Sequence, residues 1–199
     1  MNGDWMMFVD GENLTIRGTK CLQLSGIEPE AGEFYSPGIY LWAPVTDVLR
    51  SPEFVDSALP YLSPWGIRAF YYATAPGDAG ALSDVSRALR SMKFAPRVFH
   101  KQKSKKSKRV DITLATDVLS NAHLGNFDVA VLVAGDEDYL PIVEELQRMG
   151  KIVVVSFFEG EAAGLSPNLA LAADHFTPLD EYFLSRWRHR LKFQEPLWA

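Results

Sequence analysis

The sequence has very little cysteine and histidine. Of 199 residues, one is cysteine (Cys21) and four are histidine. A disulfide framework is therefore excluded, and a structural zinc site would lack its usual ligands. No apolar run reaches the roughly 18 residues of a membrane span, and the amino terminus meets Asp4 before it could form a signal peptide. We expect a cytoplasmic protein that does not contact a membrane.

The overall composition is that of an ordinary globular protein. Hydrophobic residues make up 47% of the chain and charged residues 23%, which excludes a disordered chain, a collagen-like fibre and a coiled coil. The length predicts a single domain over residues 1–199. Two parts break its regular pattern. These are a proline-rich insertion at about 20–66, with a short helix near 52–62, and a C-terminal helix at about 180–193.

Positive charge is concentrated in one segment, residues 97–109, which we call the basic strip. It holds seven of the 20 Lys and Arg and no acid, so the rest of the chain has 13 basic against 25 acidic residues, a net charge of −12. A basic segment on an acidic protein suits a polyanion such as nucleic acid. The alternative is a solvated loop without a partner.

Apolar runs of strand length alternate with helical periodicity along most of the chain. Strands are predicted at 6–10, 67–75, 95–101, 127–135 and 151–158, and helices at 81–93, 110–123, 138–149 and 167–175. The last two strands are β-branched with little alternation, as expected for strands buried on both faces. We therefore predict an open α/β fold with a mostly parallel central sheet of about five strands.

Acidic residues follow the ends of several predicted strands. Asp10 ends the first strand, Asp136 and Asp138 follow the fourth, and Asp111 opens the helix after the basic strip. The carboxyl ends of parallel strands meet at one edge, where these four carboxylates would repel one another without a cation. Because only oxygen donors are present, a hard ion such as Mg²⁺ or Mn²⁺ is favoured, and such a site suits phosphoryl chemistry.

Each of these acids also has a structural interpretation. Asp111 and Asp138 could cap helices, whereas Asp10 has no evident structural role. Asn13 is either an N-cap or a hydrogen-bonding group for substrate and water.

Three further acids are less suited to the site. Asp117 lies six residues after Asp111 and about two turns along the same helix, which makes it a poorer ligand. Glu12 and Glu137 are neighbours of the proposed ligands and could simply point to solvent.

Four segments in order resemble the signatures of the NYN domain, a branch of the PIN-like metal-dependent ribonucleases. They are FVDGEN, KRVDITLATDVL, VAVLVAGDEDYLPIVEELQRMGKIVVV and SPNLALAADHF. The resemblance implies a Rossmann-like three-layer sandwich and endonucleolytic cutting of RNA by metal-activated water. It also implies a Mg²⁺ site made by Asp10, Asp111, Asp136 and Asp138 with Asn13 close by. The chain departs from the SGDxDF pattern at Ala134, in place of Ser, and at Tyr139, in place of Phe.

The hypothesis from the sequence is a Mg²⁺- or Mn²⁺-dependent endoribonuclease that acts on RNA, with single strands favoured. Six residues of the basic strip would contact the phosphate backbone: Lys101, Lys103, Lys105, Lys106, Lys108 and Arg109. A non-catalytic RNA- or protein-binding module is the main alternative. A haloacid-dehalogenase-type phosphatase is a weaker one, because its lysine and its Ser/Thr strand end cannot be placed. The sequence leaves open RNA or DNA, one or two metal ions, and monomer or homodimer.

Overall fold

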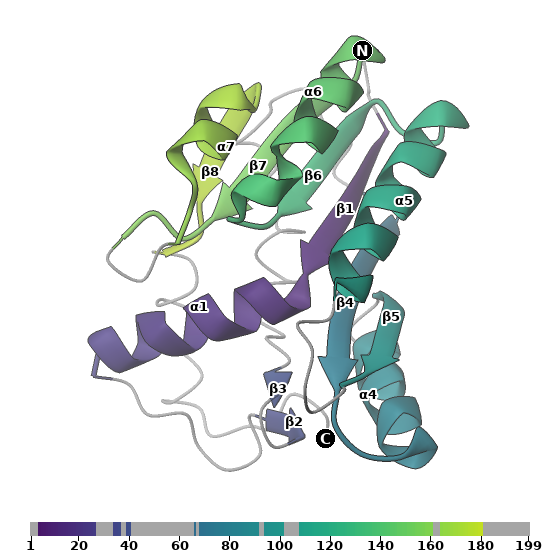
Figure 1. The fold of residues 1–199 in the computed structure, drawn as a ribbon, viewed down its shortest axis with the longest axis vertical. Coiled ribbons are helices and arrows are strands. Elements are labelled where there is room, and N and C mark those ends of the chain that lie inside the picture. The colour runs from purple at the N-terminus through teal and green to yellow at the C-terminus, as the bar shows by residue number, and fades with distance from the viewer. Residues whose placement is uncertain are drawn as a thin grey trace.

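A six-stranded parallel sheet forms the centre of the protein (Figure 1). The computed structural model describes residues 4–26, 34–36, 39–40, 66, 68–91, 94–101, 108–160 and 164–180. The strand order is β5-β4-β1-β6-β7-β8. The strands are β1 (Trp5–Asp10), β4 (Arg68–Ala75), β5 (Ala95–His100), β6 (Val129–Val133), β7 (Ile152–Phe157) and β8 (His175–Pro178). A separate antiparallel pair joins β2 (Phe34–Ser36) and β3 (Ile39–Tyr40).

Helices cover both faces of the sheet, which gives three layers. They are α1 (Gly11–Leu24), α4 (Ala79–Ser91), α5 (Arg109–His123), α6 (Leu140–Arg148) and α7 (Pro167–Ala172), with a 3₁₀ turn η1 (Glu137–Tyr139) before α6. Successive β1 side chains point to opposite faces, so Met7 packs with α1 and α4 while Phe8 packs with α5, α6 and α7. Both faces of the central strands are therefore buried, which explains their nearly continuous apolar sequence.

The predicted α/β class and all five predicted strands are confirmed, but the sheet has a sixth strand. The predicted helix 167–175 ends at Ala172, and the chain then enters β8, which pairs with β7. The Asp174 carboxylate fixes this turn by accepting a hydrogen bond from the Val153 backbone N at 2.8 Å. The predicted helix was therefore three residues too long, and the edge strand that follows it was not predicted.

The prediction also missed helix α1, whose glycines and β-branched threonines are weak helix formers. Because α1 continues to Leu24, the irregular segment begins later than residue 20, and it includes β2 and β3. The helix expected near 52–62 lies outside the described residues, as does almost all of the expected helix at 180–193. In the described part of the chain, no helix is long and apolar enough to cross a membrane.

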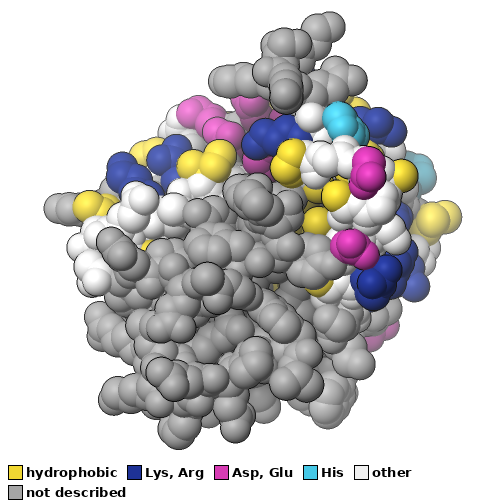
Figure 2. Space-filling model, turned by 90° about the horizontal axis from the view of Figure 1, so that it is seen from below, with side chains coloured by type: hydrophobic (Ala, Val, Ile, Leu, Met, Phe, Trp, Pro, Cys, Tyr) yellow, Lys and Arg dark blue, Asp and Glu magenta, His cyan; other side chains and the backbone are white. Residues whose placement is uncertain are grey.

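The order of the strands places a topological switch point at the end of β1. This strand pairs with β4 on one side and β6 on the other, and the chain leaves β1 toward one face and β6 toward the opposite face. Ligands of open α/β sheets bind where connections diverge in this way. Figure 2 views the protein from this end, and described acidic and basic side chains both lie on the visible face.

Candidate active site

Asp10 lies at the junction of β1 and α1 and is only 4% exposed. Its Oδ1 accepts a hydrogen bond from the Asn13 backbone N at 2.9 Å, so Asp10 is the N-cap of α1. The expectation that Asp10 lacks a structural role is therefore wrong, and Asn13 is not the cap. The tight junction requires Gly11, because a Cβ there would overlap the Tyr71 ring. The geometry fixes the Asp10 carboxylate at the carboxyl end of the central strand.

Asp111 lies in the first turn of α5, where it is partly buried. The cap position belongs to Lys108, whose side chain makes no capping bond, so capping does not account for Asp111. A negative charge in the first turn is favoured by the helix dipole, although this offsets only part of the cost of burial. The same helix carries Asp117 away from the cluster, where it accepts a hydrogen bond from the Tyr72 hydroxyl at 3.0 Å.

Asp136 and Asp138 are exposed and flank the start of η1. Neither side chain caps η1 or α6, which removes the structural interpretation of Asp138. The Asp136 Oδ2 accepts a hydrogen bond from Asn13 Nδ2 at 3.3 Å, which joins the loop after β6 to the first turn of α1. This loop passes close to β7, because a Cβ at Gly135 would overlap the Phe157 ring.

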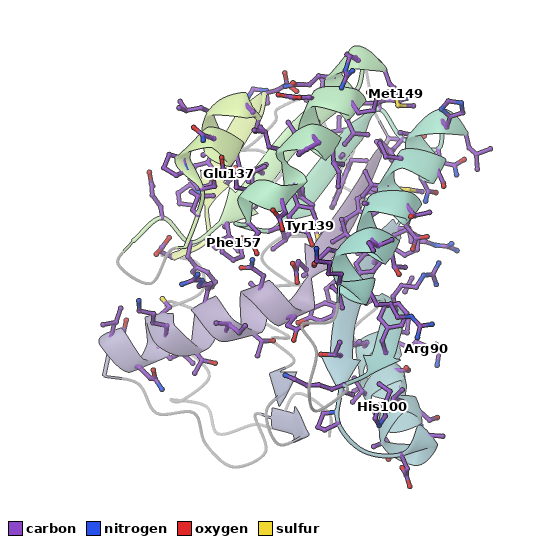
Figure 3. All side chains as sticks on the ribbon, in the orientation of Figure 1. Arg90, His100, Glu137, Tyr139, Met149 and Phe157 are labelled. Carbon is purple, nitrogen blue, oxygen red and sulfur yellow. The ribbon has the colours of Figure 1, made fainter. Side chains whose placement is uncertain are left out.

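Tyr139 is a site residue that the sequence analysis did not identify. Its hydroxyl donates to Asp10 Oδ2 at 2.8 Å and lies 3.4 Å from Asp111 Oδ1. Figure 3 shows Tyr139 between α6 and α5, above the start of α1. The only signal in the sequence was that a tyrosine stands here in place of the phenylalanine of the SGDxDF pattern.

Glu12 is also part of this edge, and the suggestion that it simply points to solvent is wrong. Its Oε1 accepts a hydrogen bond from Thr74 Oγ1 at 3.3 Å and lies 3.7 Å from Lys101 Nζ. Glu137 is engaged elsewhere, where it accepts a hydrogen bond from Asn168 Nδ2 of α7 at 2.8 Å. The sequence did not show which of these neighbouring acids faces the site.

The carboxylates share an unfavourable electrostatic environment. Burial raises the pKa of Asp10 to about 6, and the charges of Asp111 and Glu12 add to this effect, although hydrogen bonds from Asn13 and Tyr139 oppose it. The pKa of Asp111 is also raised, first by burial and then by Asp136, Glu12 and Asp138. Among the described residues, Lys101 with Glu12 is the one ion pair that involves any of these acids.

The donor set fits a hard cation, although this conformation does not hold one ready-made. No three His, Cys, Asp or Glu side chains within the described ranges converge closely enough to bind a metal ion. The donors nevertheless are all oxygens, which Mg²⁺ and Mn²⁺ prefer. In addition, Asn13 Oδ1 is buried and has no hydrogen-bond partner in the described part of the chain. Such an unsatisfied acceptor is expected where a water or ion belongs.

The described part of the basic strip lies on the same side of the sheet. Lys101 follows β5, and Lys108 and Arg109 precede Asp111 at the start of α5; all three are exposed. The Arg109 guanidinium stacks on the Phe99 ring, 4.6 Å from its centroid. Lys103, Lys105 and Lys106 lie outside the described residues.

A Rossmann-like sandwich with acids at the carboxyl edge of β1 and β6 defines an α/β protein of the PIN-like class. Residues 5–180 match the family model of the NYN domain, and the chain belongs to this family. NYN domains are PIN-like nuclease domains that are generally associated with RNA and typically metal-dependent. The recognition made from the four motifs is thus confirmed.

The fold is also similar to that of a solved structure. A crystal structure of a protein of unknown function from Vibrio parahaemolyticus superposes with a TM-score of 0.61 at 20% identity. The match covers 92% of this chain and 96% of that one. A comparison with curated proteins gives no match.

Proposed function

We propose that the protein is a metal-dependent endoribonuclease that hydrolyses phosphodiester bonds in RNA, acting as a single domain. The observation that carries the proposal is the junction of Asp10, Asn13, Asp111 and Asp136 at the carboxyl edge of the sheet. Burying and clustering carboxylates is costly when no cation offsets their charge. The fold retains this arrangement at the place where α/β proteins bind ligands.

In this proposal Asp10, Asp111, Asp136 and Asp138 would hold Mg²⁺ or Mn²⁺. The bound ion would lower the pKa of a water and polarise a phosphate oxygen. Asp10 supplies a fixed anchor, because its backbone and one carboxylate oxygen are tied to α1. Asp136 and Asp138 are more exposed, so they would remain accessible to a substrate.

Asn13 and the basic strip would bind and orient the substrate. The Asn13 amide uses its Nδ2 on Asp136 and leaves the buried Oδ1 as an acceptor for a water. Lys101, Lys108 and Arg109, with the other lysines of the strip, would attract the phosphate backbone. Such contacts position RNA without reading its sequence.

The test is incubation of a labelled single-stranded RNA with purified protein in Mg²⁺, in Mn²⁺ and in EDTA. We expect internal cutting that requires the metal and falls to background in Asp136→Asn. This variant should stay folded, because it removes a charge from a repulsive cluster. Glu137→Gln is the matched control, since Glu137 is the next residue and contacts α7 instead of the acids. Undiminished cutting by Asp136→Asn would overturn the assignment.

The alternative function is a non-catalytic RNA-binding module. The observation that favours it is that no three acidic side chains in the described residues already form a metal-binding group. This module would bind RNA in a salt-sensitive way in EDTA and would never cut it. A DNA oligonucleotide of the same sequence, included in the same assay, tests the preference for RNA.

A further inference from the structure

The Tyr139 hydroxyl links two acids that belong to different parts of the chain. Asp10 ends β1 and Asp111 lies in the first turn of α5, about a hundred residues later, yet both carboxylates lie within reach of this one oxygen at 2.8 and 3.4 Å. The Asp10 oxygen that bonds Tyr139 is Oδ2, whereas Oδ1 is held by the cap of α1. Tyr139 therefore completes the fixation of a carboxylate that α1 holds from one side only.

Core packing alone does not explain this hydroxyl. Tyr139 is 2% exposed and belongs to the buried apolar cluster that also contains Phe8, Leu132 and Leu169. A phenylalanine ring would fill the same space without the cost of burying a polar group. The hydroxyl is compensated only because it bonds acids, and both of these acids are proposed metal ligands.

We infer that Tyr139 is a positioning residue, whose hydroxyl donates its one proton to Asp10 and holds that carboxylate beside Asp111, so that a divalent cation can bind between the acids of this edge. The inference rests on the proposed function, and it deepens that function by assigning a residue that sets the metal requirement. Ligating carboxylates are oriented by hydrogen bonds from outer side chains, and loss of such a partner typically weakens metal binding by about 10- to 100-fold.

The chain contains a matched control for this role. Tyr72 is also fully buried, and its hydroxyl also donates to an aspartate, Asp117, at 3.0 Å. Asp117 is paired with Arg97 and lies outside the proposed site. Tyr139→Phe and Tyr72→Phe thus remove the same group from similar surroundings, and only the first removes it from the site.

The experiment measures Mn²⁺ binding to the metal-free full chain by calorimetry, together with its melting temperature in EDTA. The melting temperatures of both variants should fall by similar amounts, because each variant loses a buried hydrogen bond to a carboxylate. Only Tyr139→Phe should bind Mn²⁺ about 10- to 100-fold more weakly. In cutting assays its half-saturating Mn²⁺ concentration should rise by the same factor, with the KM for RNA unchanged.

The outcomes separate this inference from the proposed function. If the natural protein binds Mn²⁺ and Tyr139→Phe binds it equally well or more tightly, the positioning role is overturned and the nuclease proposal stands. If Tyr72→Phe loses as much affinity as Tyr139→Phe, general destabilisation explains the effect and the inference is also overturned. If the natural protein binds no Mn²⁺, both proposals are wrong.

Discussion

Helix α5 carries two aspartates in contrasting surroundings. Both Asp111 and Asp117 lie near the hydroxyl of a buried tyrosine, at 3.4 and 3.0 Å. Asp117 also accepts from Arg97 Nε at 2.9 Å, whereas the charges that act on Asp111 are those of Asp136, Glu12 and Asp138. The same helix thus presents one carboxylate whose charge is neutralised by an arginine and one that is surrounded by other carboxylates.

The difference indicates which carboxylate has a structural role. Pairing Asp117 with Arg97 offsets its charge at modest cost, because both side chains keep some solvent contact. Asp111 gains no such partner among the described residues, so its conformation is retained at the expense of stability. Active sites commonly hold charge in this uncompensated form until a ligand supplies the opposite sign.

The largest expected effect comes from replacing Asp111 and Asp117, one at a time, by the uncharged asparagine. Asp111→Asn should reduce metal-dependent cutting by about three orders of magnitude, because it removes a proposed metal ligand and not only a residue that hydrogen-bonds to one. The free energy of unfolding of this variant should be equal to that of the natural protein or higher. Asp117→Asn should cut normally and lose about 1 kcal/mol of unfolding free energy. Cutting assays and urea denaturation of the two variants check this. Equal activity of the two variants would show that the contrast along α5 has no functional meaning.

Sequence reasoning located the acids because strand ends can be recognised from short apolar runs. Asp10 follows the run MMFV, and two residues separate Asp136 from the run VAVLV. Parallel topology then requires that they share an edge. Contacts that depend on the tilt of packed elements were not accessible. Two such contacts are those of Glu12 with Thr74 and of Tyr139 with Asp10. Both depend on how α1 and η1 are oriented on the sheet.

The two missed elements, α1 and β8, have a related explanation. Gly11 and Gly18 are buried in α1, and at Gly11 a Cβ would overlap the Tyr71 ring of β4, so tertiary contacts override weak helix propensity. Strand β8 has four residues, of which the outer two are exposed and the inner two are half-buried, too few for a periodic signal. In both cases packing against the sheet, which a local sequence window does not contain, determines the conformation.

The second prediction concerns the cost of burying Asp10. Because its pKa is raised to about 6 from 3.8, the folded protein binds the proton more tightly than the unfolded chain. Stability should therefore fall as pH rises from about 4 to about 6, with a total loss on the order of 3 kcal/mol. Asp10→Asn keeps the N-cap and should remove this slope, so that it is more stable than the natural protein at pH 7.

Denaturation in EDTA between pH 4 and pH 7.5 measures this effect. Asp84→Asn, which removes an acid on α4 that is paired with Arg87, corrects for the loss of one negative charge in general. If the unfolding free energy of the natural protein and of Asp10→Asn had the same slope against pH, the charge of the buried Asp10 carboxylate would be compensated in solution. The contrast between Asp111 and Asp117 would then not extend to the rest of the cluster.

The smallest effects are expected from two cations that pair with acids, Arg97 with Asp117 away from the site and Lys101 with Glu12 at its edge. Both contacts are partly exposed, so each contributes less than about 1 kcal/mol to stability. Arg97→Gln should lose most of that amount and bind RNA normally, because Arg97 is engaged by Asp117.

Lys101→Gln should be nearly neutral in stability, since the Lys101 nitrogen lies 3.7 Å from Glu12, but it should weaken RNA binding at low salt. If Lys101 contacts one phosphate, the slope of log affinity against log salt should fall by about 0.7 for a single strand. Fluorescence anisotropy across a salt series measures both variants, and equal slopes would place the RNA backbone away from the edge where Lys101 meets the acids.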